Sequence, residues 1–232
     1  MKIERFQSFG LLALALMLAG VLAACGGGGD SGSSSESGTG GGDSSAANLG
    51  QTIESEAPDG TTITISYPDG WFAQESSGSI TLSNDETLVT SGATGQFTGD
   101  QIAGQVLYLG DAAAGLAAAS LPVDATPLDV LSALSANFAG AGGIQVELNE
   151  PESFTANGKE AAIMTGDGTS EEGSGSLALV LVEEGDGYVL LTFAAAQGQL
   201  AQYDDEIRAI AGTVEVIAGA TDDATAEPSP AG

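Results

Sequence analysis

Two long apolar segments joined by a short turn set the tightest limit on the fold of this 232-residue chain. They cover residues 176–182 and 188–194, and both are apolar at nearly every position. Such strands are buried on both faces of a sheet, whereas a half-exposed strand alternates between apolar and polar residues. The connection Glu183-Glu184-Gly185-Asp186-Gly187 carries the Asp-Gly pair typical of a tight hairpin. The sequence therefore predicts a central hairpin with a cover on each side.

Further strands are expected on either side of this hairpin. They alternate or are rich in β-branched residues, and they cover residues 61–67, 79–83, 105–109, 144–148 and 158–164. The first of them ends in Pro68-Asp69-Gly70, a strong turn signal. We expect Trp71 and Phe72, which follow this turn, to anchor the core.

Two stretches are typical of helices. Thr126-Pro127-Leu128-Asp129 places Thr at the N-cap, Pro at the first helical position and Asp in the first turn. Apolar residues then recur at helical spacing up to Phe138, and Gly140 follows as a stop. The second helix is marked by apolar residues on one face, namely Leu200, Tyr203, Ile207, Ile210 and Ala211. Runs of antiparallel strands with two helices predict an α+β domain, an antiparallel β-sheet flanked by helices.

The first 24 residues are typical of a signal peptide. Lys2 and Arg5 give a positive start, and residues 11–21 form an apolar run. The run ends in Leu22-Ala23-Ala24-Cys25, which resembles the lipobox of bacterial lipoproteins. This resemblance implies cleavage after residue 24 and acylation of Cys25, which would anchor the chain to the extracytoplasmic face of the cell membrane. The alternative is a buried apolar helix that happens to precede a Cys.

The mature chain divides into three parts. Residues 25–49 hold the lipidated Cys and a Gly/Ser-rich linker, which we expect to be a flexible tether with a root-mean-square span of roughly 25–30 Å. Residues 50–218 are enough for one domain with its own core, and too few for a two-lobed solute receptor. Residues 219–232 predict a disordered acidic tail.

The charge of the chain excludes several classes of function. It has 32 acidic residues, 4 basic residues and no His, and residues 50–218 alone hold 25 acidic and 2 basic residues. Nucleic acid and anionic lipid would repel such a surface. Without His there is no His-based triad or His-ligated zinc, and one Cys forms no internal disulfide. We expect no cofactor, and we expect Arg208 to pair with Asp204 and Asp205 on its helix.

Three short motifs resemble the PsbP/Mog1-like superfamily. They are Tyr67-Pro68-Asp69-Gly70-Trp71, Asn157-Gly158-Lys159-Glu160-Ala161, and Asp186-Gly187-Tyr188-Val189 together with Glu206-Ile207. The resemblance covers most of residues 60–217. It implies an antiparallel sheet flanked by helices, and accessory or binding roles instead of catalysis. No interaction motif of the superfamily recurs here, so no partner-binding residue is carried over.

Carboxylates are the only abundant reactive groups, and two acidic loops contain oxygens that Ca²⁺ could use. The candidate ligands are Asp167, Glu171, Glu172, Glu183, Glu184 and Asp186. Neither loop has the EF-hand register, so solvated hairpin tips are the favoured interpretation and no metal site is assigned. A Gly-x-Ser-x-Gly elbow and a phosphate-binding loop are both absent from the sequence.

These patterns predict a membrane-anchored extracytoplasmic lipoprotein with a non-catalytic binding or accessory domain, and not an enzyme. An unidentified protein or small molecule would be its partner, apart from the membrane reached through Cys25. An alternative is a carrier or sensor of a small apolar ligand or lipid, held beneath the small-residue segment 111–121. A carboxylate-based hydrolase would need two acidic groups across a cleft, usually with aromatic platforms. Aromatic residues are only 5% of the chain, which disfavours that alternative.

Overall fold

The computed structural model describes residues 48–90, 97–111, 121–122, 124–138, 145–170, 173–185, 187–217 and 219. In chain order these residues form β1 (Gln51–Glu56), β2 (Thr62–Tyr67), β3 (Phe72–Ser76), β4 (Ser79–Ser83), α2 (Glu86–Thr90), β5 (Ile102–Asp111), α4 (Pro127–Phe138), β6 (Gln145–Leu148), β7 (Glu152–Ala156), β8 (Lys159–Ser170), β9 (Gly173–Glu184), β10 (Gly187–Ala196), the 3₁₀ helix η1 (Leu200–Tyr203), α5 (Asp204–Ala211) and β11 (Glu215–Ile217). Antiparallel strands thus dominate, with few helices, which is the predicted α+β class.

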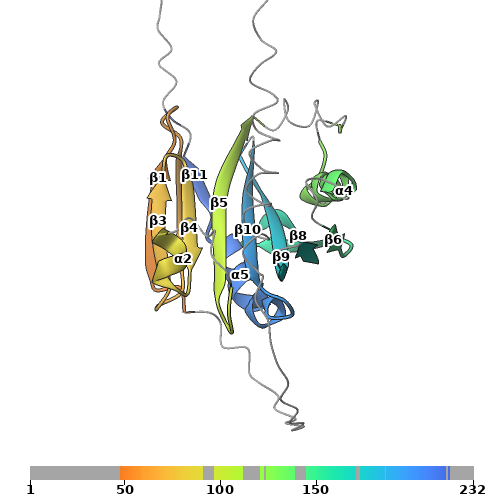
Figure 1. Ribbon diagram of the computed structural model, residues 1–232. Helices are drawn as coiled ribbons and strands as arrows, with labels where there is room; N and C mark the ends of the chain where they lie inside the picture. The colour runs from red at the N-terminus through yellow and green to blue at the C-terminus, as the bar shows by residue number, and fades with distance from the viewer. Residues whose placement is uncertain are drawn as a thin grey trace, which may run out of the picture.

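The described strands form two sheets instead of the single sheet that the sequence predicts (Figure 1). The larger has eight strands, of which seven follow the order β3-β4-β5-β10-β9-β8-β6, while β7 also pairs with β8. The smaller has the order β1-β2-β11. The small sheet was not foreseen because β1 is largely exposed, and its sequence carries little apolar alternation.

The central hairpin is confirmed. Strands β9 and β10 lie in the middle of the large sheet, and Glu184 pairs with Gly187, which leaves a two-residue loop. Gly185 in that loop has φ +60°, a conformation that Gly adopts without steric cost and that primed hairpin turns require. Nearly every residue of β10 is buried, as expected of a strand that is covered on both faces.

One face of the large sheet packs against the small sheet and α5, which form one continuous core with it. In β2 the side chains alternate, so Ile63 and Ile65 are fully buried in this core while Thr64 between them is half-buried. Helix α5 adds Ile207 and Ile210 to the same core.

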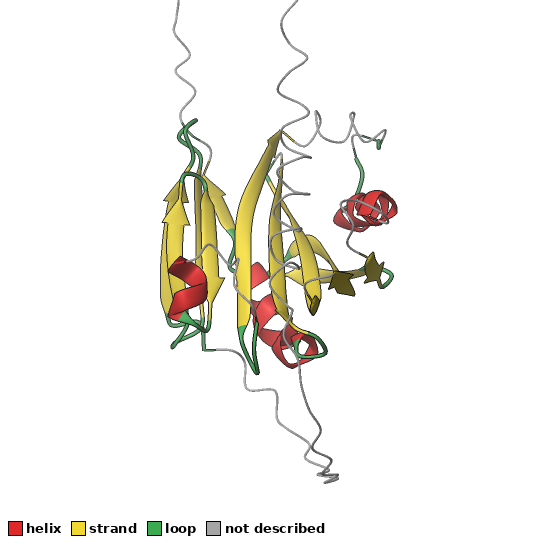
Figure 2. Ribbon diagram, in the orientation of Figure 1, coloured by secondary structure: helices red, strands yellow, loops and turns green. Residues whose placement is uncertain are grey.

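The other face of the large sheet is covered in part by α4 (Figure 2). Leu131 of α4 is fully buried there, and the Tyr188 hydroxyl donates to the Ala125 carbonyl at 2.5 Å. The predicted start of this helix is confirmed, because the Asp129 carboxylate accepts from the Thr126 backbone N–H at 3.0 Å and the Thr126 hydroxyl accepts from the Asp129 N–H. The segment 112–120, Gly140 and Ile144 lie outside the described residues.

The two aromatic residues after the first turn differ in burial. Trp71 packs against the main core and meets the Tyr203 ring edge-on, with centroids 6.2 Å apart, as predicted. The prediction for Phe72 is wrong, because its side chain is 40% exposed. Neighbouring residues of an extended segment point to opposite sides, and β3 is an edge strand with little cover on its outer side. Only one of the two rings can therefore reach the core.

Candidate functional site

A pocket of about 180 Å³ lies where β8 and β9 run past the start of α5. Twelve described residues line it: Asn149, Ile163, Thr165, Gly166, Asp167, Ser176, Ala178, Gly198, Leu200, Ala201, Asp204 and Ile207. Because β8, β9, η1 and α5 each contribute, the pocket depends on how the C-terminal helical segment docks onto the large sheet.

The pocket has an apolar floor and a polar rim. Ile163, Ala178, Leu200 and Ile207 are all buried, so aliphatic groups form its inner wall. Asp167 is exposed at the rim. A ligand with an apolar body and a polar or charged head fits this division best.

Hydrogen bonds fix the rim on the sheet side. The buried Ser176 hydroxyl donates to Asp167 Oδ1 at 2.6 Å and accepts from the Gly198 backbone N–H at 2.9 Å. On the same side, the Asn149 amide donates to the Thr165 hydroxyl at 2.9 Å. Asp167 is therefore held in place while its side chain still faces solvent, so it can interact with a bound group.

The second carboxylate of the rim comes from α5. Asp204 Oδ2 accepts from Arg208 Nε at 2.7 Å, which confirms the expected pairing with Asp204, one turn along the helix, but not the one expected with Asp205. Arg208 also approaches Glu152, with 3.6 Å between Nη2 and Oε2, and its guanidinium lies over the Phe154 ring, 4.9 Å from the centroid. These contacts hold Arg208 on the outer side of α5, toward β7.

The candidate metal ligands do not come together. Asp167 pairs across the sheet with Ser176, whereas Glu184 lies eight residues further along β9, about 26 Å away at the usual rise of a strand. Glu184 forms an ion pair with Lys159, and Glu183 is exposed beside it. Within the described residues no group of three or more His, Cys, Asp or Glu could hold a metal ion. Glu171, Glu172 and Asp186 lie outside those residues.

Tyr203 and Asp85 stabilise the connection between β4 and β5, near the pocket end of the sheet. The Tyr203 hydroxyl contacts the Asp100 carbonyl and accepts from the Asn84 amide, and partial burial, followed by the charge of Asp100, raises the pKa of Tyr203. Asp85 accepts from the Thr87 hydroxyl and the Gln101 amide, and these bonds lower the pKa of its carboxyl. The surroundings of the pocket are thus fixed by many polar contacts.

The lipid-anchor residue lies outside this description. Cys25 and the whole of residues 1–47 are not among the described residues, so the predicted signal peptide and lipidation remain predictions. A search of the described part of the chain for an apolar helix long enough to cross a membrane finds none.

No family model matches the chain, and a search of curated proteins finds no match. Among solved structures, a Bacteroides thetaiotaomicron protein aligns over 73% of this chain with 15% identity and a TM-score of 0.43, and the chain spans about half (49%) of that protein. PsbP of Synechocystis aligns over 78% of this chain and 98% of its own length, with 15% identity and a TM-score of 0.43. LpqN of Mycobacterium tuberculosis, described as involved in cell envelope biogenesis, aligns over 72% of this chain and 90% of its own length, with 14% identity and a TM-score of 0.37.

A PsbP is thus among the solved structures with which this chain aligns. Because identities are at most 15% and these TM-scores are below 0.5, the likenesses assign no partner and no activity to this chain.

The sequence did not reveal the pocket. It singled out Asp167 as a loop carboxylate and Asp204 as a helix ion-pair partner, but gave no reason to bring them to one cavity. A weak signal was present, because Ser176 is the polar residue that opens an otherwise apolar strand and is buried in the structure. A buried hydroxyl needs a partner, and Asp167 on the neighbouring strand supplies it.

Proposed function

We propose that the chain is a lipid-anchored extracytoplasmic protein whose folded domain is a non-catalytic binding or accessory module. The sequence of residues 1–25 supports the anchor, because a short apolar run, small residues and a single Cys follow one another. The observation that carries the binding role is the pocket with its apolar floor and fixed polar rim. An extracytoplasmic domain on a tether can meet partners within a few nanometres of the membrane.

The anchor is tested by fractionation of cells that express the full chain. The unchanged protein should pellet with membranes, and globomycin should leave its signal peptide uncleaved. Cys25→Ser should abolish lipid modification, so that the protein no longer pellets with membranes and its signal peptide is processed differently. Ser33→Ala in the tether should change neither the membrane retention nor the processing. If Cys25→Ser is processed and retained like the unchanged protein, the lipid anchor is wrong.

A carrier of a large apolar ligand receives no support from the described pocket. Its volume of about 180 Å³ is below the roughly 300–1,000 Å³ of sites for drug-sized ligands, and an acyl chain would need more room. The space beneath segment 111–121, where the sequence places such a ligand, lies outside the described residues.

A hydrolase is a second candidate because Asp167 and Asp204 line one pocket. However, Ser176 and Arg208 already engage these carboxylates, and no aromatic side chain is among the described residues that line the pocket. A sugar-binding cleft normally offers such platforms. Turnover of aryl glycosides that disappears in Asp167→Asn would favour the hydrolase over the binding module.

A further inference from the structure

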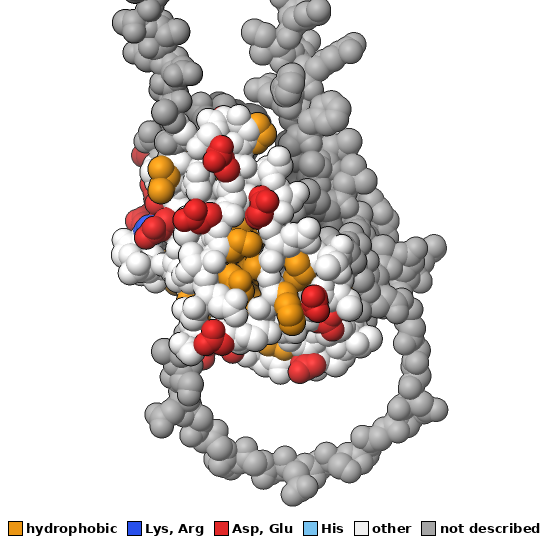
Figure 3. Space-filling model, turned by 90° about the vertical axis from the view of Figure 1, so that its left-hand side faces the viewer, with side chains coloured by type: hydrophobic (Ala, Val, Ile, Leu, Met, Phe, Trp, Pro, Cys, Tyr) orange, Lys and Arg blue, Asp and Glu red, His pale blue; other side chains and the backbone are white. Residues whose placement is uncertain are grey.

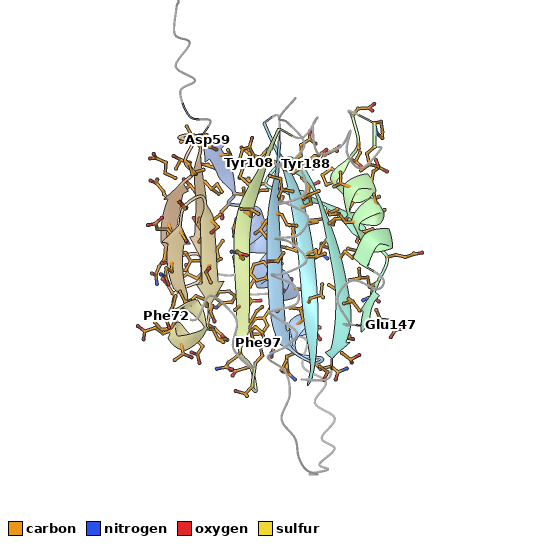
Figure 4. All side chains as sticks on the ribbon, turned by 45° about the horizontal axis from the view of Figure 1, so that its top comes forward. Asp59, Phe72, Phe97, Tyr108, Glu147 and Tyr188 are labelled. Carbon is orange, nitrogen blue, oxygen red and sulfur yellow. The ribbon has the colours of Figure 1, made fainter. Side chains whose placement is uncertain are left out.

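The end of the sheet that carries the pocket has an excess of negative charge. Strand pairing brings the turn after β2, the connection between β4 and β5, and the start of α5 to this same end. Figure 4 shows Phe72, Phe97 and Glu147 at this end, and Asp59, Tyr108 and Tyr188 at the other. The carboxylates near the pocket end are Asp69, Asp85, Glu86, Asp100, Glu147, Asp167, Asp204 and Asp205.

Few cations offset this charge. Of the two basic residues in the domain, Lys159 pairs with Glu184 at the far end of β8 and β9. Arg208 is held by Asp204, Glu152 and the Phe154 ring. On the face drawn in Figure 3, acidic side chains are spread over the surface, and the basic side chain that is visible lies against acidic ones. The pocket end therefore presents a field that attracts cations.

The pocket has the shape and chemistry of a site for one lysine side chain. A lysine has a four-carbon stem, which suits the walls formed by Ile163, Leu200 and Ile207. Its ammonium is a compact charge with three donors, which suits carboxylates at a rim. Asp167 and Asp204 stand there on two different elements. The volume of about 180 Å³ is enough for a single side chain.

We propose that the pocket end of this domain docks a basic segment of a partner protein, and that one lysine side chain of that segment inserts between Asp167 and Asp204. The inference deepens the proposed binding function and rests on it. Charge complementarity identifies the occupant, because both cations of the domain are already engaged within the chain, two carboxylates line the pocket and further carboxylates lie at the same end of the sheet.

The test uses the full chain purified in detergent and a synthetic peptide of Gly and Ser with three lysines. Binding is measured by calorimetry at low and at moderate salt. A second peptide replaces the central lysine by 2,4-diaminobutyrate, which keeps the ammonium near neutral pH but shortens the stem. Free 1,5-diaminopentane is the probe for a small amine.

Asp167→Asn should weaken binding of the lysine peptide about fivefold, because it removes one rim charge and keeps an acceptor for Ser176. Glu56→Gln is the matched control, since it removes one charge from the opposite end and should change affinity less than twofold. Ala201→Leu fills the pocket from an exposed position without a change of charge, and should also weaken binding about fivefold. The short-stem peptide should bind the unchanged protein about fivefold more weakly than the lysine peptide, and Ala201→Leu should remove that difference.

Three results would overturn the inference. Equal losses for Asp167→Asn and Glu56→Gln would indicate non-specific attraction, and equal affinity for the two peptides would exclude insertion of the stem. Competition by diaminopentane at the affinity of the peptide would indicate a site for free amines instead of a protein segment. These results are independent of the membrane-fractionation test of the lipid anchor. A protein that pellets with membranes but fails to bind the peptide would refute this inference and leave the anchor untouched.

Discussion

The two ends of strands β8 and β9 contain the same kinds of charged residue but use them differently. At the hairpin end, Glu184 faces Lys159, whose ammonium also donates to the Val214 carbonyl at the entry to β11. At the pocket end, the Asp167 carboxylate accepts from the Ser176 hydroxyl, and its side chain stays exposed. At the hairpin end, Lys159 thus pairs with a carboxylate that is mostly buried and links the two sheets, whereas at the pocket end the Asp167 carboxylate stays exposed to a partner. Both basic residues of the domain, Lys159 and Arg208, are thus engaged in ion pairs within the fold.

Among the substitutions that test this contrast, the loss of Lys159 should have the largest effect on the free energy of unfolding. Lys159→Met leaves Glu184, whose side chain is only 17% exposed, without its cation, and leaves Val214 without a donor. We expect the free energy of unfolding to fall by about 2 kcal/mol, between the values for exposed and for buried pairs. Urea unfolding followed by Trp71 fluorescence measures it.

Arg208→Met is the matched control at the pocket end. Its partners Asp204 and Glu152 are well exposed, so the expected loss is about 0.5–1 kcal/mol. Equal losses for Lys159→Met and Arg208→Met would show that the two ends are stabilised alike and would contradict the contrast.

A smaller effect is expected from Tyr188, which closes the hairpin end beneath α4. Burial, followed by the charges of Glu183, Asp129 and Glu160, raises the pKa of Tyr188 above its ordinary value near 10. A pKa that is higher in the folded state means that stability is fully present below pH 10 and is lost as the pH rises through the folded pKa. Tyr188→Phe leaves the Ala125 carbonyl without this donor and should cost about 1 kcal/mol at pH 7.

The pH dependence separates this tyrosine from its counterpart near the pocket. The loss of stability above pH 10 should become shallower in Tyr188→Phe, as followed by unfolding in parallel with tyrosinate absorbance. Tyr203→Phe should flatten it less, because Tyr203 is only half-buried, although its pKa is raised as well. An alkaline profile unchanged in Tyr188→Phe would be the contrary result.

The same contrast shows what a sequence can and cannot reveal. The hairpin of β9 and β10 was predictable because continuous apolar strands and an Asp-Gly turn are local signals. The start of α4 was predictable for the same reason, since Thr126 and Asp129 cap it within four residues. The helix of Leu200 to Ala211 was predictable from its apolar face, although its first turn is 3₁₀.

The pocket and the small sheet depend on contacts between distant segments. Asp167 and Asp204 are separated in the chain by β9, β10 and η1, and nothing local in the chain requires them to meet. Strand β11 pairs with β2 across about 150 residues of sequence, and β1 has only one fully buried residue to mark it. Such placements follow from how the covered faces pack together, which periodicity alone does not encode.

The smallest effects are expected from two carboxylates near the surface, one at each end. Hydrogen bonds from the Thr61 backbone and side chain lower the pKa of Asp59 at the hairpin end. Bonds from the Thr87 hydroxyl, the Gln101 amide and the Thr87 backbone lower that of Asp85 at the pocket end. A pKa that is lower in the folded state means that the contribution to stability is present above the ordinary value near 3.8 and is lost as the pH falls through the folded pKa.

Melting temperatures between pH 5 and pH 2.5 compare the two sites. Asp85→Asn and Asp59→Asn should each lower the melting temperature at pH 5. Between pH 5 and pH 2.5, the melting temperature of each variant should then fall by less than that of the unchanged protein. The change should be larger for Asp85, because more donors reach its carboxylate. Glu56→Gln is the control for the repulsion that every protonation relieves, since its side chain is exposed. If all three variants follow the acid profile of the unchanged protein, the hydrogen bonds to Asp59 and Asp85 do not stabilise the fold, and acid stability reflects net charge alone.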